Sequence, residues 1–199
     1  MARKTSANLE LTKQKIVEAG LDLFERQGFN ATGIQQITTV VGVPKGSFYN
    51  YFSSKEDFCV AIITYYTEKN SRKWQELLIG GGKDPYLALR FTWEQLILQY
   101  ENAEPKKGCL LGNFAAEISE ASEECRLAME QSVEKFKEIL VRQLGLAQKQ
   151  SKVRQDLTTE EIADLLWNCW QGSLLRMKIE KSTMPLKNVI KVLDTVLVE

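Results

Sequence analysis

The cysteines are the residues of this sequence whose chemistry stands out first. Cys59, Cys109, Cys125 and Cys169 form no Cys-x-x-Cys pair, which excludes a zinc knuckle and a thioredoxin-like motif. Cys109 follows two lysines and a glycine at positions 106–108, and the pattern predicts that it begins a helix. Cationic neighbours and a helix N-terminus both favour the thiolate, so Cys109 is a candidate reactive thiol. The alternative is that it is a small buried apolar residue, the role that we expect for the other three.

Acid–base and metal chemistry find little support in the sequence. The chain has no histidine, which excludes Ser-His-Asp and Cys-His catalysis, His-ligated zinc and an imidazole pH switch. Glu117, Glu120 and Glu124 would share one face only of a continuous helix, and a break is expected at residues 119–122. Acidic residues in the first turn of a helix are also explained by the helix dipole. We therefore expect no catalytic site, no metal site and no cofactor.

The overall composition is typical of a folded globular protein. The 199 residues are 44% hydrophobic and 26% charged, and 26 basic residues balance 26 acidic ones. This balance argues against nucleic-acid binding by bulk electrostatics, so any contact with DNA must depend on local placement of groups. No apolar run is long enough to span a bilayer, and no signal-peptide core follows the N-terminus. We expect a cytoplasmic protein that does not contact a membrane.

The elements that position these residues are predicted to be helices throughout. The first helix is expected to begin with Thr12 as N-cap and to end at a left-handed Gly28. A capping box formed by Thr32 and Gln35 predicts the start of a second helix, which Gly42 ends.

A third short helix is predicted over residues 45–51, directly after the Gly42 turn. Two short helices joined by a glycine-containing turn are typical of a helix-turn-helix. The N-terminus of the second helix of such a motif enters the major groove of DNA, and Lys45, Gly46 and Ser47 lie at that position. The alternative is a set of three short helices that pack together without binding DNA.

Longer helices are predicted in the rest of the chain. A capping box of Ser53 and Glu56 opens a helix that extends to about residue 78, before a glycine linker at residues 80–83. Further helices are expected over residues 85–100, 109–118, 122–146 and 159–181, and from residue 185 onward. Residues 164–177 are apolar on nearly all faces, so this segment, with helix 122–146, is the candidate dimer interface.

The N-terminal part of the chain resembles the DNA-binding domain of the tetracycline-repressor (TetR) family. The resemblance covers residues 12–64 and rests on four stretches: Thr-Lys-Gln-Lys-Ile-Val-Glu-Ala-Gly at 12–20, Gly-Phe-Asn-Ala-Thr at 28–32, Val-Gly-Val-Pro-Lys-Gly-Ser-Phe-Tyr-Asn-Tyr-Phe at 41–52, and Ser-Lys-Glu-Asp-Phe at 54–58. It implies a homodimeric transcriptional regulator that binds successive half-sites of a palindromic double-stranded DNA operator.

The resemblance also implies roles for individual residues. Thr32 is similar to a phosphate anchor, and Tyr49 and Lys55 are similar to backbone-phosphate contacts. Gln35 stands where many relatives carry a basic or base-contacting residue, so the operator sequence does not follow from the motif. The candidate DNA-binding residues are Thr32, Gln35, Lys45, Gly46, Ser47, Tyr49, Asn50 and Lys55.

The C-terminal part carries a second resemblance. Gly-Cys-Leu-Leu-Gly-Asn-Phe-Ala-Ala-Glu at 108–117 is similar to a motif of a TetR subgroup that includes the N-ethylmaleimide-reductase repressors. That subgroup implies sensing of electrophiles or oxidants by Cys109, with Lys178 as a second sensor residue. The alternative is a non-covalent ligand pocket, or aromatic side chains that are plain core. The pocket candidates are Trp93, Tyr100, Phe114, Trp167 and Trp170.

Together these observations predict an all-α protein with an N-terminal three-helix DNA-binding domain and a C-terminal helical bundle for ligand sensing and dimerisation. We expect a DNA-binding domain at residues 1–55, a connecting helix at 56–79 and a regulatory and dimerisation domain at 80–199. The predicted function is that of a repressor that a small-molecule or electrophilic inducer releases from its operator. The alternative is an all-α ligand-binding module or enzyme that does not bind DNA.

Overall fold

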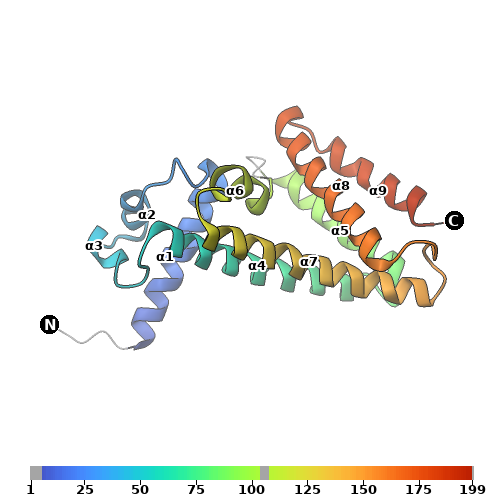
Figure 1. Cartoon of the computed structure of the whole chain (residues 1–199), viewed down its shortest axis with the longest axis horizontal. Coiled ribbons are helices and arrows are strands. Elements are labelled where there is room, and N and C mark those ends of the chain that lie inside the picture. The colour runs from blue at the N-terminus through green and yellow to red at the C-terminus, as the bar shows by residue number, and fades with distance from the viewer. Residues whose placement is uncertain (1–5, 104–107, 199) are drawn as a thin grey trace. The chain divides into compact units, whose positions relative to one another are not determined.

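The computed structural model describes residues 6–103 and 108–198, and the regular secondary structure within these ranges consists of helices (Figure 1). The prediction of an all-α fold is confirmed for this part of the chain. The chain divides into two compact units. The first unit combines Met1–Tyr66 with Leu110–Glu130, and the second combines Thr67–Cys109 with Gln131–Glu199. None of the helices in the described ranges is both long enough and apolar enough to cross a bilayer.

The first unit is built around a core of aromatic rings. It contains α1 (Ser6–Gln27), α2 (Ile34–Val41), α3 (Lys45–Phe48), the start of α4 (Lys55–Gly80), α6 (Leu110–Ile118) and the start of α7 (Glu123–Lys149). Aromatic side chains from α1, α3, α4 and α6, and from two of the turns between helices, contact one another with ring centroids 4.8–6.3 Å apart. The buried rings are Phe24, Phe29, Phe48, Phe52, Phe58 and Phe114.

Two of the predicted helix starts in this unit are wrong. α1 begins at Ser6, and Thr12 lies inside it, where its hydroxyl donates to the Asn8 carbonyl at 2.8 Å. The N-cap of α2 is Gly33, because the Thr32 hydroxyl donates backward to the carbonyl of Gly28 at 2.7 Å instead of capping α2.

The start of α4 and the end of α3 also differ from the prediction. The cap of α4 is displaced by one residue: Asp57 N–H donates to Ser54 Oγ at 2.9 Å, and Ser53 N–H donates to Asp57 Oδ2 at 2.8 Å. α3 is shorter than expected, because Asn50 and Tyr51 N–H bond carbonyls three residues back, as in a tighter turn, after the helix ends.

The second unit contains the longer helices of the chain. These are the remainder of α4 and α7, α5 (Pro85–Asn102), α8 (Thr159–Glu180) and α9 (Met184–Val196). The predicted caps are confirmed: Asp84 accepts from the first amides of α5, and Thr158 and Glu161 form the capping box of α8. In the predicted linker, α4 continues to Gly80, and Gly81 lies so close to α5 that a Cβ would come within 2.5 Å of the Ala88 Cα.

Helix α8 does not have the all-round burial that its composition suggested. One face is buried in the second unit, whereas the opposite side exposes Leu175 and Ile179, which are 61% and 71% accessible. Leu165, 38% accessible, adds to this exposed apolar set. Within the described single chain, α8 therefore has an apolar face that other parts of the chain leave uncovered.

Candidate DNA-binding surface and sensor residues

The turn between α2 and α3 has the geometry of a helix-turn-helix connection. Gly42 adopts a left-handed conformation with φ of +73°, which favours glycine because it has no Cβ. Gly42 N–H donates to the Thr39 carbonyl at 3.1 Å, and Val43 N–H donates to the Thr38 carbonyl at 3.0 Å. These bonds satisfy the last carbonyls of α2 and direct the chain into α3, the neighbouring short helix (Figure 1).

The orientation of α3 is set by the aromatic core beneath it. Phe48 is fully buried, with its ring 5.3 Å from Phe52 and 5.2 Å from Phe58. Because the Phe48 side chain points inward, the following residues are turned toward solvent: Tyr49 is 54% accessible and Asn50 is exposed. A rigid hydrophobic base therefore presents the polar residues of α3 outward.

Six of the eight predicted DNA-binding residues have the accessibility that a contact with DNA requires. Gln35 lies on α2, and the others lie on α3 and the turn that follows it. Ser47 is half-buried and the remaining five are exposed. They are Gln35, Lys45, Gly46, Ser47, Tyr49 and Asn50.

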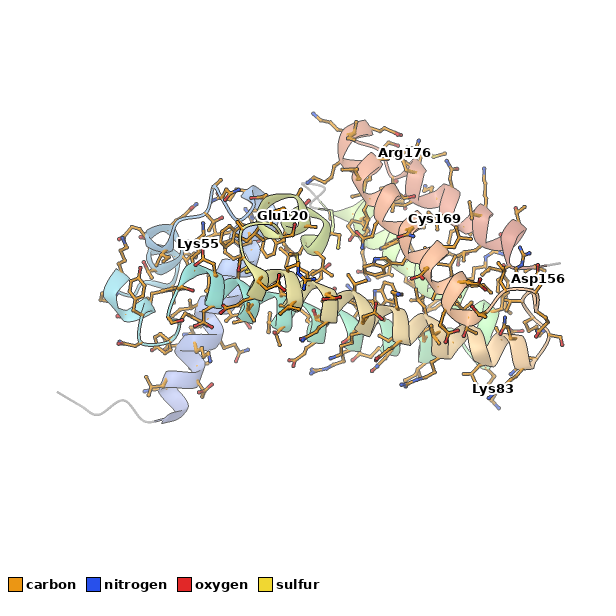
Figure 2. All side chains as sticks on the ribbon, viewed as in Figure 1. Lys55, Lys83, Glu120, Asp156, Cys169 and Arg176 are labelled. Atoms are coloured by element: carbon orange, nitrogen blue, oxygen red, sulfur yellow. The ribbon has the colours of Figure 1, made fainter. Side chains whose placement is uncertain are left out.

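The structure gives Thr32 and Lys55 internal contacts instead. Thr32 is fully buried in the α1–α2 turn. The ammonium group of Lys55, labelled in Figure 2, lies 2.5 Å from the Phe29 carbonyl oxygen and 4.1 Å from the centre of the Phe29 ring. Burial lowers the pKa of the Lys55 ammonium, and the nearby Glu56 carboxylate opposes this effect. Both side chains therefore hold the turn together, and the phosphate contacts of Thr32 and Lys55 stay predictions.

A carboxylate from α6 closes the same turn from the other side. Glu117 Oε2 accepts the Asn30 backbone N–H at 2.9 Å, across a sequence separation of 87 residues. Gly28 has a φ of +83°, and a Cβ at that position would lie 2.2 Å from Glu117 Oε1. In the sequence Glu117 stands among other acidic residues, and no local pattern predicts this contact. Gly28 itself indicates only a left-handed helix end and does not identify Glu117 as its neighbour.

Cys109 lies in the second unit, in the position directly before α6. Its side chain is buried, and Gln171 Nε2 donates to its Sγ at 3.5 Å. The Tyr100 hydroxyl donates to the carbonyl of the preceding Gly108 at 3.5 Å. The two lysines at 106 and 107, which the sequence analysis placed beside the thiol, lie outside the described residues. Lys178 is exposed in the last turn of α8.

The predicted pocket residues fall into three separate groups. Trp93, Tyr100 and Trp170 form one cluster in the second unit, with the Trp170 ring 4.9 Å from Trp93 and 6.1 Å from Tyr100. Trp167 instead stacks on Phe136, another residue of that unit, at 5.7 Å.

Phe114 lies apart from the other predicted pocket residues. Its ring contacts Phe24 at 5.3 Å in the core of the first unit, so its assignment to a ligand pocket is corrected. The physical reason is that α6 directs its buried face toward the aromatic core of that unit.

Trp93 has one unusual feature. Its side chain is fully buried, yet its indole N–H has no hydrogen-bond acceptor among the described residues. A buried donor without a partner is energetically costly, and it can be satisfied by a ligand that carries an acceptor. Within the described residues, no group of three or more cysteine or carboxylate side chains is placed to hold a metal ion.

Comparison with known proteins reveals similarity over both units. The profile described as "Bacterial regulatory proteins, tetR family" matches residues 16–62, and that described as "Tetracyclin repressor-like, C-terminal domain" matches residues 87–193. The first range contains the α2–α3 turn, and the second contains Cys109 and the Trp93 cluster.

Individual relatives match along nearly the whole chain. The sequence is 33% identical over 184 residues to the HTH-type transcriptional repressor DhaR of Mycobacterium sp. (strain GP1), covering 90% of this chain and 89% of that protein. It is 28% identical over 179 residues to the HTH-type transcriptional repressor NemR of Escherichia coli (strain K12), covering 90% of each chain. The crystal structure of the reduced form of E. coli NemR has a TM-score of 0.87 and 27% identity, covering 94% of this chain and 97% of that chain.

Proposed function

The chain belongs to the tetR family of bacterial regulatory proteins, and we propose that it is a homodimeric repressor whose release from DNA is triggered in its C-terminal part. The observation that carries the proposal is the α2–α3 turn, whose buried Phe48 base presents an exposed polar surface. That surface has the size and polarity to enter a major groove.

The dimer follows from the uncovered face of α8. Leu175 and Ile179 are each more than half accessible in the single chain, and such apolar surface on a soluble helix favours association with a second copy. We propose that α8, with α7, forms this interface. Two recognition helices related by the dimer axis would then bind half-sites about 34–36 Å apart, one turn of duplex.

We assign roles along the chain as follows. Residues 1–55 bind DNA, and residues 80–199 sense the signal and dimerise. Residues 56–79 form the helix that connects these two domains. Cys109 is directly followed by α6, and α6 carries the Glu117 carboxylate that holds the turn before α2. A chemical change at Cys109 could therefore shift α6 and, through Glu117, the turn that precedes the helix-turn-helix. Because its target is the chromosome, the protein acts in the cytoplasm.

Two kinds of inducer fit the candidate sensor residues. An electrophile would bond to the Cys109 sulfur, and Gln171 is placed to donate a hydrogen bond at that point. A non-covalent ligand would instead offer an acceptor to the unpartnered Trp93 N–H, with Tyr100 and Trp170 beside it. Either one must favour the released state by about 5.5 kcal/mol to move the protein from nearly all bound to nearly all free.

A mobility-shift assay on the DNA upstream of the protein's own gene tests the DNA-binding part. We expect a shift at low salt with the full-length protein. No shift with any promoter-proximal fragment would contradict the repressor proposal and favour a ligand-binding module or enzyme that does not bind DNA.

The nature of the inducer is tested by adding an electrophile such as N-ethylmaleimide to the bound complex. Release that is lost in Cys109→Ala and kept in Cys169→Ala supports covalent sensing. If Cys109→Ala releases normally while Trp93→Phe abolishes induction by a ligand, the non-covalent mode is supported instead.

A further inference from the structure

A second pair of cysteines lies in the first unit, apart from the sensor residues. Cys59 on α4 and Cys125 on α7 are both fully buried, and their thiols are hydrogen-bonded to each other. Cys125 Sγ also lies 3.7 Å from the Glu56 carbonyl oxygen, one turn before Cys59 on α4. Two residues distant in the sequence thus place their sulfur atoms side by side.

The surroundings of the two sulfur atoms are not equivalent. Cys125 lies in the first turn of the 27-residue helix α7, where backbone amides favour a negative charge, and its own N–H donates to Ser122 Oγ at 3.3 Å. The hydrogen bond with Cys59 lowers the pKa of Cys125 to about 7, whereas the same bond, together with burial, raises the pKa of Cys59. Cys125 is therefore the thiol of the pair that ionises more readily, and Cys59 is the neighbouring thiol.

We propose that Cys59 and Cys125 are an oxidation site that forms an intramolecular disulfide when a peroxide is the oxidant. The Cys125 thiolate attacks one oxygen of the peroxide, the O–O bond breaks, and the sulfur becomes a sulfenic acid while the other oxygen leaves as water or alcohol. The Cys59 thiol then attacks that sulfur, the S–O bond breaks, and a second water leaves as the S–S bond forms. The two thiols together lose two electrons and two protons, which the peroxide accepts.

Access to the buried pair is provided by the end of α7. The first turn of α7 begins with the exposed Glu123 and Glu124, and Ser122 before it is half-buried. Helix ends open at a lower free energy than helix centres, so a small oxidant reaches Cys125 when this turn opens. The reaction is therefore expected to be slower than that of an exposed thiol, and to discriminate against bulky oxidants.

The disulfide would covalently join α4 to α7 within the unit that carries the helix-turn-helix. α4 also carries Lys55, four residues before Cys59. The Lys55 ammonium donates a hydrogen bond to the Phe29 carbonyl of the α1–α2 turn. The oxidised form is thus expected to restrict the elements on which α2 and α3 depend. This site is separate from Cys109, and replacing Cys109 by serine distinguishes oxidation of the Cys59–Cys125 pair from a reaction at Cys109.

The experiment uses the full-length Cys109→Ser/Cys169→Ser variant, in which Cys59 and Cys125 are the only cysteines. After treatment with hydrogen peroxide and denaturation, we expect the titratable thiols to fall from two to none and the intact mass to fall by that of two hydrogen atoms. Dithiothreitol should restore both thiols. The matched control adds Cys59→Ser, and its lone Cys125 should gain oxygen instead of losing hydrogen.

Peptide mapping of the wild-type protein gives an independent readout that does not depend on the folding of any variant. Cleavage after glutamate separates residues 57–68 from residues 125–130, whereas trypsin would leave Cys109 and Cys125 together in residues 108–126. A cross-linked pair of peptides 57–68 and 125–130 supports the proposal. Oxygen added to Cys125 without a cross-link, or a bond from Cys125 to Cys109 or to a second chain, would overturn it.

Discussion

Two side chains of opposite charge meet at the turn formed by residues 28–30. The Lys55 ammonium donates to the Phe29 carbonyl, and the Glu117 carboxylate accepts the Asn30 N–H. Each satisfies a backbone group in a segment that lacks the regular hydrogen bonds of a helix. Burial lowers the pKa of Lys55, and the Glu117 charge partly opposes this shift. The position of α2, which starts four residues later, therefore depends on these two contacts.

Replacing Glu117 is expected to affect both stability and operator binding. Glu117→Ala removes the acceptor of the Asn30 N–H, so the free energy of unfolding should fall by about 1–2 kcal/mol, because a hydrogen bond to a charged group is lost. Operator affinity should fall with it, since the turn that sets the position of α2 loosens. Denaturant titration and mobility-shift assays measure the two effects.

The matched control for this prediction is Glu117→Gln, which keeps an oxygen acceptor at the same place. It should recover most of the stability and the affinity. If Glu117→Gln lowers stability and affinity as much as Glu117→Ala does, the loss is caused by removing the charge near Lys55 and not by removing the hydrogen bond.

Lys45 is the cation best placed to contact DNA in the helix-turn-helix. From Asn30 to Lys55 the only charged residues are Lys45 and Lys55. The Lys55 ammonium donates a hydrogen bond to the Phe29 carbonyl. Lys45→Ala should weaken binding evenly across operator sequences and lower the salt dependence by about one unit for each phosphate contact removed. Binding measured over a salt series checks this slope.

The control for Lys45 is Lys149→Ala, which removes an exposed lysine at the end of α7. Its salt slope should equal that of the wild-type protein. An unchanged slope in Lys45→Ala would show that Lys45 does not contact phosphate.

At the scale of elements, the ends of helices differ in how well a local pattern predicts them. The caps at Asp84 and Thr158 were both predicted correctly, since Asp84 directly precedes a proline and Thr158 stands three residues before Glu161. At residues 53 and 54 two serines compete, and the structure uses Ser54. At Thr32 the hydroxyl has a better partner behind it, the Gly28 carbonyl, so the cap of α2 is left to Gly33.

The connection between α2 and α3 is expected to be sensitive to backbone strain alone. Gly42 has a φ of +73°, and nothing lies within 4 Å of a Cβ built there. Gly42→Ala should therefore lower the free energy of unfolding by about 1–2 kcal/mol, the cost of a left-handed non-glycine residue, without a steric clash. Thermal or denaturant unfolding measures it.

Gly33→Ala provides the comparison at the other end of α2. Gly33 also has open space around it, and its φ of −96° suits any residue. It should cost clearly less than Gly42→Ala. Equal losses would mean that the strain explanation for Gly42 is wrong.

For the whole molecule, the balance of charge limits how the protein can bind DNA. Residues 1–70 contain 8 basic and 7 acidic side chains, and the remainder contains 18 and 19, so neither part is basic. Non-specific affinity should therefore be modest, because it depends on phosphate neutralisation. Specific binding has to come from the placement of Lys45 and the uncharged polar residues around it.

Below neutral pH, the stability of the whole chain should depend on pH mainly at the acidic end. With no histidine in the sequence, no imidazole titrates between about pH 5 and 6.5, and stability should be constant there. A backbone N–H from Leu87 holds the pKa of Asp84 below its ordinary value, and Arg154 and Thr158 do the same for Asp156 and Glu161. Because these folded-state pKa values lie below the unfolded ones, their stabilisation is complete above the ordinary values of 3.8 and 4.5 and is lost as the pH falls further.

Unfolding midpoints measured from pH 7 down to pH 2 check this prediction. Asp84→Asn keeps a side-chain acceptor at the cap of α5 but does not titrate, so its decline in acid should be shallower. A loss of stability that begins well above pH 5 would contradict the assignment to these carboxylates.

Much of the fold and of the candidate DNA-binding surface could be predicted from the sequence by itself. The helices follow from periodic apolar residues, and several of their ends follow from a cap within three or four residues, because these interactions are local along the chain. The same holds for the Gly42 turn and for Lys45, Tyr49 and Asn50, which lie outward because Phe48 lies inward.

Only the tertiary structure decided which distant side chains meet. It directed Lys55 to Phe29, brought Glu117 to the turn 87 residues before it, placed Phe114 in the first unit and paired Cys59 with Cys125. Helical periodicity states which face of a helix is buried but not what covers it, and these contacts join segments with no regular spacing between them. The packing of α4, α6 and α7 in the first unit positions these five side chains, so that two of them hold a turn, one completes an aromatic core and two form a thiol pair.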